Sequence, residues 1–366
     1  MIRRTLTAGA AFAVLACSGG GSAPATAPSP TGGAKLYVVN QSGASITVID
    51  QQRLAVDTVI DLRGLGFTAN AKPHHIAVEA DGSFWYASLI GDGRVLKFDR
   101  ANHLLGQVKM ETPGLLTLDP VHDSLYVGRS MTAVNPPKAL GVIARKAFVM
   151  IEEQEILIPR PHALAVTLDG KWVHTASLAE NRIASVETAT GRVTITTIPG
   201  APRSLVQFAL SPDGRTMIAG GELSNTVLVF DLTKPPPYAP VKEIPLAGKP
   251  WDPRFAKDGK HAYITLLAKN AVAEVDVTTG TVVRTIEGRM AQPYGMVLRA
   301  DNKYAFVVNQ NTGALMPGQS GHEMHGMDGH AASDGWLTIL DLASGTVHST
   351  LMLGNGPTGI GAARAR

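Results

Sequence analysis

The chain has 366 residues, with 33 Lys and Arg against 30 Asp and Glu, and its formal net charge is +3. With charges so nearly balanced and no basic stripe along it, the sequence lacks the electrostatic footprint of a nucleic-acid-binding protein. Its single cysteine, Cys17, excludes an intrachain disulfide and a metal site made of several thiolates.

The first 16 residues predict a secretory signal peptide. Two arginines precede an apolar run from Leu6 to Ala16, which is too short to span a bilayer permanently. The run closes with the letters VLAC, ending at Cys17, and resembles the lipobox of bacterial lipoproteins. We therefore predict a lipoprotein-type signal over residues 1–16 and acylation of Cys17. An ordinary signal peptide with an incidental cysteine is the alternative.

After the cysteine, the stretch up to residue 33 reads SGGGSAPATAPSPTGG. These small, polar and proline-interrupted residues cannot bury a core, so residues 17–33 are predicted to form a flexible tether. Ser18, directly after the cysteine, resembles a signal for sorting to the outer membrane of a Gram-negative cell. We expect a protein that is exported across the inner membrane and anchored in the periplasm, at the outer membrane, by its lipid alone.

From residue 34 to residue 366 the chain repeats one short pattern, in which apolar residues alternate with small or polar ones up to a closing acid. The copies are ASITVID, GRVLKFD, NRIASVE, NTVLVFD, NAVAEVD and GWLTILD, ending at Asp50, Asp99, Glu187, Asp231, Asp276 and Asp341, with a degraded seventh copy, KALGVIA, ending at Ala144. Alternation of this kind predicts strands. Strands repeated at a fixed period without helices are typical of radial β architectures.

Each copy is the third strand of a larger predicted unit of four strands. A turn such as Asp81-Gly82 or Asp301-Asn302 joins the first strand to the second, since these residues tolerate the positive φ of tight hairpins. A more polar fourth strand ends the unit. A proline opens each unit, and these prolines are Pro73, Pro113, Pro161, Pro202, Pro250, Pro293 and Pro357.

These units predict an all-β fold, a seven-bladed β-propeller of four-stranded antiparallel blades. The prolines from Pro73 to Pro293 open six complete blades. KLYVVNQ, ASITVID and AVDTVIDL at the N-terminal end supply three strands of a seventh blade, and GPTGIGAA at the C-terminal end supplies its first strand. Sharing one blade between the two ends protects the sheet edges. Because each blade packs only on its neighbours, residues 34–366 are predicted to form one ring.

The stretch KLYVVNQSGASITVID, which begins at Lys35, resembles the repeat of the YVTN-repeat, YncE-like family of seven-bladed propellers. KYAFVVNQ and HAYITLL match that repeat more loosely. The resemblance extends over nearly everything after residue 34. It implies the propeller fold and no particular chemistry, because the family is defined by its scaffold.

Propeller geometry predicts where a ligand would bind. The first strand of each blade lines the central channel, so the residues just after the opening prolines should gather at one mouth, where convergent polar groups favour a ligand site. Our candidates for binding a cofactor or another small ligand are His74, His75, His162, Arg203, Trp251, Asp252 and Tyr294. Alternatively, these are polar residues that bond to exposed backbone. Neighbouring strand residues also point opposite ways, so His74 and His75 need not both face the channel.

A long loop is predicted between the second and third strands of the blade that begins at Pro293. It contains His322, Met324, His325, Met327 and His330. Imidazole binds both copper oxidation states and the soft thioether favours Cu(I), so this composition suits copper. The segment resembles the Met- and His-rich stretches of periplasmic copper-handling proteins. We predict a copper site here, on the same face as the mouth histidines, with a solvated Gly-rich insertion as the alternative.

Five other histidines are predicted to be structural or exposed. His122 and His261 lie near turns on the opposite face, and His174 lies inside a second strand. His103 and His348 belong to fourth strands and should be surface residues. None of these five joins the candidate site.

Together these features predict a lipid-anchored envelope propeller that binds a metal ion or small ligand, above all copper, at the channel mouth. One alternative is a scaffold for another envelope protein. A second is a tetrapyrrole binder like the haem d1 propellers, using His74, His162, Arg203 and Tyr294. A third is an enzyme such as a propeller lactonase, which is poorly supported because Asp252 is the only carboxylate predicted at the mouth. The sequence does not decide whether a substrate is turned over.

Overall fold

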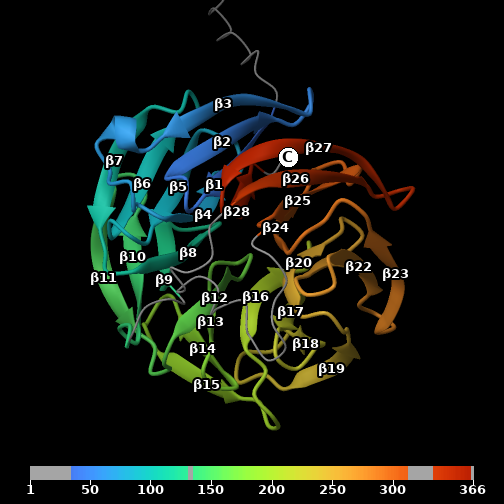
Figure 1. Cartoon of the computed structure of the whole chain (residues 1–366). Helices are drawn as coiled ribbons and strands as arrows, with labels where there is room; N and C mark the ends of the chain where they lie inside the picture. Colours follow the sequence, from blue (N-terminus) through green and yellow to red (C-terminus); the bar gives the residue numbers. More distant parts are fainter. Residues whose placement is uncertain (1–33, 131–134, 312–332, 364–366) are drawn as a thin grey trace, which may run out of the picture. The chain divides into compact units, whose positions relative to one another are not determined.

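Seven antiparallel sheets of four strands each make up the ring shown in Figure 1. This is a computed structural model, and it describes residues 34–130, 135–311 and 333–363. The sheets confirm the predicted all-β class and the predicted seven four-stranded blades. Within the described ranges the only helix is one 3-10 turn, η1 (Arg63–Leu65), and no helix there is long and apolar enough to cross a membrane.

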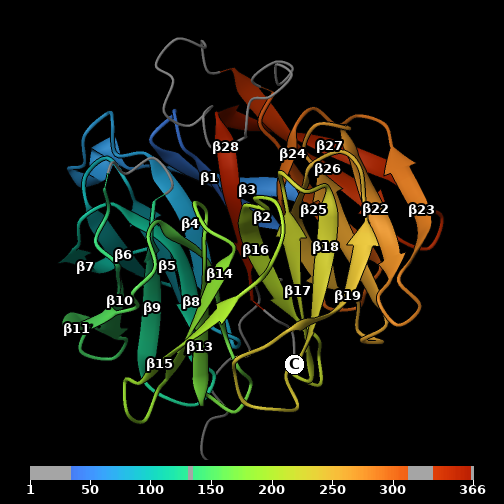
Figure 2. The ribbon, with the colours of Figure 1, turned by 90° about the horizontal axis from the view of Figure 1, so that it is seen from below.

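The first strand of every blade lies nearest the centre of the ring, and the chain then runs outward strand by strand (Figure 1, Figure 2). The first strands are β4 (Pro73–Val78), β8 (Pro113–Leu118), β12 (Pro161–Val166), β16 (Leu205–Leu210), β20 (Pro250–Phe255), β24 (Pro293–Leu298) and β28 (Pro357–Ala362). The second strands are β5 (Phe84–Leu89), β9 (Ser124–Arg129), β13 (Trp172–Ser177), β17 (Thr216–Gly221), β21 (His261–Leu266), β25 (Tyr304–Asn309) and β1 (Lys35–Asn40).

All seven copies of the repeated sequence pattern fall on third strands, as predicted. These are β6 (Arg94–Asp99), β10 (Ala139–Ala144), β14 (Arg182–Glu187), β18 (Thr226–Asp231), β22 (Ala271–Asp276), β26 (Asp334–Asp341) and β2 (Ser45–Asp50). The outermost, fourth strands are β7 (Leu104–Lys109), β11 (Val149–Glu155), β15 (Val193–Thr197), β19 (Pro240–Pro245), β23 (Thr281–Glu287), β27 (Thr346–Asn355) and β3 (Ala55–Asp61).

The two ends of the chain close the ring within one sheet, whose strand order is β28-β1-β2-β3. β28 pairs antiparallel with β1, with Gly361 opposite Tyr37 and Ile360 opposite Val38. The predicted blade shared by the N- and C-terminal strands is therefore confirmed. Since this pairing joins the first described strand to the last, the ring has no open end.

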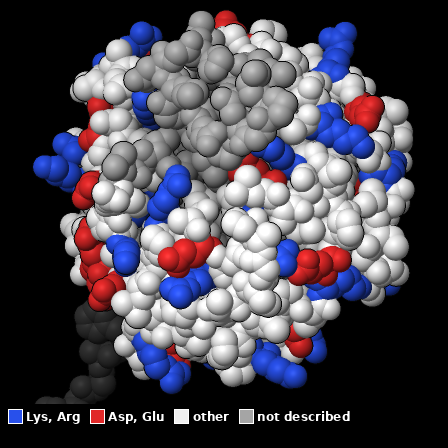
Figure 3. Space-filling model, turned by 60° about the horizontal axis from the view of Figure 1, so that its bottom comes forward, with Lys and Arg blue, Asp and Glu red and all other residues white. Residues whose placement is uncertain are grey.

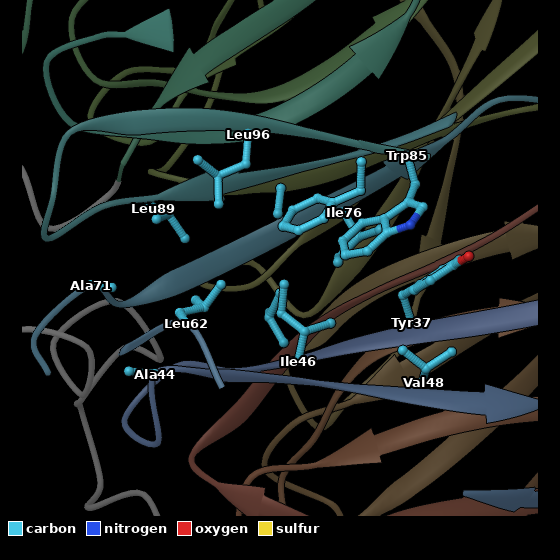
Figure 4. Close-up of a cluster of buried hydrophobic side chains, with 13 residues drawn as sticks. Tyr37, Ala44, Ile46, Val48, Leu62, Ala71, Ile76, Trp85, Leu89 and Leu96 are labelled. Carbon is cyan, nitrogen blue, oxygen red and sulfur yellow. The ribbon is translucent and has the colours of Figure 1, made fainter. Parts of the chain in front are cut away.

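Each blade buries both of its faces against its neighbours. The buried apolar side chains form one cluster at each of the seven junctions between consecutive blades. At one junction the Trp85 ring stacks on Tyr37 of the next blade with 4.5 Å between ring centroids (Figure 4). It also stacks on Phe98, with 4.0 Å between ring centroids. Because successive strand residues point to opposite faces, one strand can serve two junctions.

Positive φ angles occur at the hairpins that join first to second strands. The predicted turns at Asp81-Gly82 and Asp301-Asn302 are of this kind, and so are those at Asp169-Gly170, Asp213-Gly214 and Asp258-Gly259. Their second residues, Gly82, Gly170, Gly214, Gly259 and Asn302, have φ between 59° and 71°. These turns lie at the end of the channel where the first strands finish. They set the length of each hairpin and so bring the chain back toward the other end of the channel.

A second set of left-handed residues, which the sequence did not reveal, directly precedes every first strand. The φ angle lies between 42° and 60° at Lys72, Thr112, Arg160, Ser204, Lys249, Gln292 and Gly356. The carbonyl oxygen of each accepts a hydrogen bond from the residue after the second strand, as Lys72 does from Ile90 at 3.0 Å. Six of the seven are not glycine, so each of those six strains the backbone by about 1 kcal/mol or more.

Thr112 and Gly356 occupy this position in two different blades and allow a matched test. Thr112 is β-branched and poorly suited to its φ of 42°. We expect Thr112→Gly to raise the free energy of unfolding by about 1 kcal/mol. Gly356→Ala should lower it by about 1–2 kcal/mol, because φ is 60° and an added Cβ would lie 2.6 Å from Ser42 Oγ. Urea unfolding measures both shifts, and shifts of the same sign would contradict this account.

Candidate functional site

The second residue of each first strand lies at the channel mouth, which we define as the end of the channel at which the first strands begin. These residues are His74, Gly114, His162, Val206, Trp251, Tyr294 and Thr358. All seven are buried. The residues that follow the second strands are hydrogen-bonded to the backbone just before the first strands, so they lie at the same mouth. They include the buried Gln41, Ser130, Leu178, Glu222, Leu267 and Gln310.

The channel mouth has an apolar side and a histidine side. Trp251 and Tyr294, with 4.8 Å between ring centroids, belong to a buried apolar cluster with Leu178, Val206 and Leu267. On the histidine side, the ring centroids of His74 and His162 are 6.3 Å apart. The blade between these two histidines contributes Gly114, which has no side chain to separate them.

Hydrogen bonds fix both mouth histidines in one tautomer. His74 Nδ1 lies 3.1 Å from Gln41 Oε1, and His162 Nδ1 lies 2.8 Å from the carbonyl oxygen of Val206. Since an amide or carbonyl oxygen only accepts, each Nδ1 carries the proton and the neutral ring has its lone pair on Nε2. An imidazole oriented through Nδ1–H in this way is the usual form of a histidine metal ligand.

The third residues of the first strands lie one step further along the channel, where they line a cavity of about 10 Å³. From this level the lining comprises His75, Leu115, Gln207, Asp252, Gly295 and Gly359. Arg254, two residues after Asp252 on the same strand, also lines it, as do Ile360 and the mouth residues His74 and Tyr294. The two glycines follow Asp252 around the ring, and His75 comes after them, so the polar groups face a gap between side chains.

Asp252 is a fully buried carboxyl in this cavity, with 1% of its surface exposed. Its Oδ2 accepts hydrogen bonds from the Met296 N–H at 2.8 Å and from Arg254 Nη2 at 2.9 Å. Its Oδ1 has no hydrogen-bond partner among the residues that the structure describes. Burial raises the pKa of Asp252 to about 6, and the Arg254 charge only partly opposes this rise.

His75 presents a different nitrogen from the mouth histidines. Its Nδ1 accepts a hydrogen bond from the Leu116 N–H at 3.1 Å, so the proton of the neutral ring lies on Nε2. Burial, and after it the charge of Arg254, holds the pKa of His75 well below its usual range. In the channel His75 is therefore a neutral hydrogen-bond donor.

Six of the seven predicted ligand-binding residues lie at the mouth or in the cavity below it. His74, His162, Trp251 and Tyr294 are at the mouth, and His75 and Asp252 are in the cavity. The predicted single ring of residues thus occupies two adjoining levels of the channel, and His74 and Tyr294 contact both. Whether these residues bind a ligand stays a prediction.

Arg203 does not lie at the mouth position that the opening prolines predicted for it. β16 begins at Leu205, which lies opposite Gly221 just as Pro161 lies opposite Ser177 in the preceding blade. Pro202 is therefore three residues early, and the true equivalents of His162 and Ala163 in this blade are Val206 and Gln207. The Arg203 guanidinium instead pairs with Glu243 of the outermost strand β19 at 2.7 Å.

The predicted copper ligands, His322, Met324, His325, Met327 and His330, lie outside the described residues, as does Cys17. The residues on either side of the segment are described, and Ser333 Oγ donates a hydrogen bond to the Asn311 carbonyl oxygen. Because Asn309 pairs with Pro293 at the start of β24, the chain leaves the sheet here on the face of the channel mouth. Within the described part of the chain, no group of three His, Cys, Asp or Glu side chains could hold a metal ion.

Sequence reasoning missed three polar residues of the site. Gln41 binds His74, and Arg254 pairs with Asp252. Glu222 is fully buried at the mouth, with Lys249 Nζ 3.7 Å from its carboxylate. Gln41 and Glu222 both directly follow second strands, so reading those positions in every repeat would have found them.

The other histidines lie where the sequence predicted. His122 and His261 contact Asp119 and Asp258 at the opposite end of the channel. His174 is buried with its Nδ1 2.9 Å from Ser185 Oγ, and burial lowers its pKa to about 4. His103 and His348 are exposed.

Charged side chains of both signs are interspersed over the described part of the face in Figure 3. No large patch of one sign appears among the described residues in that view. The absence of a nucleic-acid partner stays a prediction.

Comparison with solved structures places the fold among known architectures. A protein of unknown function from Desulfotomaculum acetoxidans aligns with a TM-score of 0.72 and 12% identity, over 91% of this chain and 99% of that one. This chain is a seven-bladed β-propeller. A "putative 6-phosphogluconolactonase" from Bacteroides uniformis aligns with a TM-score of 0.65 and 14% identity, over 90% of this chain and 99% of that one. At such identities the likeness shows the fold alone.

No family model and no curated protein matches the sequence. The resemblance to the YVTN repeat therefore remains a prediction about ancestry, although the propeller that it implied is present. The comparisons leave the chemistry of the channel to be argued from its own residues.

The raised pKa of Asp252 makes the stability of the ring depend on pH. The unfolded carboxyl titrates near 3.8 and the folded one near 6, so between these values only the folded state keeps the proton. The contribution of Asp252 to stability therefore falls as the pH rises through this window. At neutral pH the folded protein must keep a buried carboxylate. The contribution of Asp252 to the free energy of unfolding is therefore about 3 kcal/mol lower there than at acid pH.

We expect Asp252→Asn, which keeps the shape and removes the charge, to stabilise the protein at about pH 7.5 by up to about 3 kcal/mol more than at about pH 3.5. Guanidinium unfolding at both pH values measures this difference. Asp258→Asn is the control. Burial alone would raise the pKa of exposed Asp258, but hydrogen bonds from His261 outweigh it and lower the pKa. The pH dependence of this variant should therefore have the opposite sign. An equal effect of Asp252→Asn at both pH values would show that ionisation is not its cause.

Proposed function

We propose that this propeller binds a metal ion, copper, at the channel mouth, and that it does so as a lipid-anchored protein of the bacterial cell envelope. One observation carries the proposal: two buried histidines of non-neighbouring blades, His74 and His162, are both held through Nδ1–H with their lone pairs on Nε2. A histidine that binds a metal ion must be neutral, and a hydrogen bond at its other ring nitrogen usually fixes its orientation.

The spacing of the two rings also suits a shared metal ion. A metal–nitrogen bond is about 2 Å long and the ring centre lies about 1 Å beyond the nitrogen, so two imidazoles on opposite sides of one ion have centroids about 6 Å apart, and a smaller angle at the ion brings them closer together. The rings of His74 and His162 are 6.3 Å apart. In this proposal the two histidines supply two of the ligands and hold the ion between them, on the histidine side of the mouth.

Two nitrogens alone would bind copper weakly, so further ligands are needed. The proposal assigns these to Met324, Met327 and the histidines of the segment 312–332, whose described neighbours lie on the face of the mouth. Thioether sulfur is a soft ligand that favours Cu(I), whereas zinc and nickel would gain little from it. The apolar side of the mouth, with Trp251 and Leu267, would limit the access of water to such an ion.

The alternatives have less support from the described residues. The tetrapyrrole model needed Arg203 for a propionate, but Arg203 pairs with Glu243 instead. A lactonase-like site would need several carboxylates around a hard cation, and no such group occurs within the described residues. A scaffold for an envelope protein requires a docking surface, and no observation here favours one.

Metal retention tests the proposal directly. The full-length protein is offered copper, zinc or nickel, dialysed, and its bound metal is counted by plasma mass spectrometry. We expect about one copper ion per chain and less zinc or nickel, since only copper uses the thioethers. His74→Ala combined with His162→Ala should weaken copper binding at least about tenfold, because both histidine ligands are lost.

Two further variants separate the parts of the site. His322→Ala with His325→Ala should also weaken copper binding, whereas the exposed pair His103→Ala with His348→Ala is the matched control and should not. If copper binding is lost in His322→Ala with His325→Ala but kept in His74→Ala with His162→Ala, the channel mouth is not part of the copper site. Absence of retained copper in the unaltered protein would refute the proposal.

The lipid anchor is tested separately. We expect Cys17→Ser to abolish incorporation of radiolabelled palmitate and to move the protein from the membrane fraction to the soluble periplasmic fraction, because serine cannot carry the thioether-linked lipid. Labelling that survives this substitution would contradict lipidation at Cys17. The copper site does not depend on the outcome.

A further inference from the structure

We infer that the cavity below the channel mouth, which shares His74 and Tyr294 with the mouth, is a binding site for one hydroxyl group, which donates a hydrogen bond to Asp252 Oδ1 and accepts one from His75 Nε2. This inference does not depend on copper binding at the mouth. It rests on the shape of the cavity, on the hydrogen-bonding state of two side chains, and on the charge balance around them.

The cavity exists because two adjacent first strands carry glycine at the third position. A Cβ added to Gly295 would lie 2.7 Å from the Thr358 carbonyl oxygen, and one added to Gly359 would lie 2.2 Å from the His74 carbonyl oxygen. No side chain can therefore fill this part of the ring without moving the backbone. The gap between Asp252 on one side and His75 on the other is built into the packing of the inner strands.

The carboxylate of Asp252 is only half satisfied by the described residues. Its Oδ2 accepts two hydrogen bonds, from Met296 and Arg254, while its Oδ1 is buried and accepts none from the described residues. A buried charged oxygen without a donor is expensive, by about 1–3 kcal/mol or more. The side chain lines the cavity, so a donor placed there would remove this cost.

His75 lines the same cavity with the complementary group. Its Nδ1 is used by the Leu116 N–H, so the neutral ring offers Nε2–H as a donor. A hydroxyl group donates one hydrogen bond and accepts others, so it can satisfy an acceptor and a donor at once. A purely accepting group, such as a carbonyl, would leave Asp252 Oδ1 unsatisfied.

The charge balance and the size of the cavity restrict the kind of group that can bind there. Asp252 and Arg254 neutralise each other at 2.9 Å, so the cavity offers little net attraction to a cation or an anion. Its volume of about 10 Å³ is close to the smallest that holds one water-sized group. The site therefore fits a single neutral hydroxyl, either a water molecule or the terminal hydroxyl of a small alcohol or polyol.

Crystal structures of the full-length protein, without and with ethylene glycol, test the inference and separate the two sources. We expect an oxygen atom within hydrogen-bond distance of both Asp252 Oδ1 and His75 Nε2. An isolated oxygen that persists in the diol would identify a structural water. Continuous density for the diol would identify a site that takes ligand hydroxyls.

Variants at the carboxyl keep the test decisive. Asp252→Ala should lose the oxygen atom because its acceptor is gone, whereas Asp252→Asn, which preserves the shape, and Asp258→Ala, at the exposed end of the same blade, should keep it. Saturation-transfer NMR with ethylene glycol gives the same comparison in solution. A cavity without an oxygen atom, an oxygen unaffected by Asp252→Ala, or Oδ1 bonded to a protein donor would overturn the inference.

Discussion

Burial of both faces of every blade against its neighbours is the interaction on which the rest of this ring depends. A four-stranded sheet with two apolar faces cannot be stable alone in water, so each blade needs both neighbours and the ring must close. The pairing of β28 with β1 completes that closure. The stacked rings of Tyr37, Trp85 and Phe98 show how densely one junction is filled.

Close packing at the centre also determines what the channel can hold. The first strands approach so closely that Gly295 and Gly359 leave no room for a Cβ, and at Gly114 the missing side chain lets His74 approach His162. Left-handed residues before each first strand bring the ends of two strands per blade to the same mouth. The side chains of the candidate site are therefore held in place by closely packed backbone, which favours binding of one group of defined shape.

The polar groups in the channel oppose the stability of the ring that holds them. Burial keeps His75 neutral, and it makes the Asp252 carboxylate unfavourable at neutral pH. Arg254 offsets part of that cost, although it binds only one of the two carboxylate oxygens. Displaced pKa values of this kind cluster at functional sites, although ion pairs in structural cores also produce them.

The amino-acid sequence by itself determined the blades, because alternation, hairpin turns and acid-ended third strands are local features that each repeat carries complete. Even the blade shared by the two ends followed from counting strands. Only the tertiary structure decided the site, since its members meet through space. It showed that Arg203 faces Glu243, because strand pairing rather than Pro202 sets where β16 begins. It also brought Gln41 to His74, because two neighbouring blades pack against each other there, and it placed Arg254 beside the buried carboxyl of Asp252.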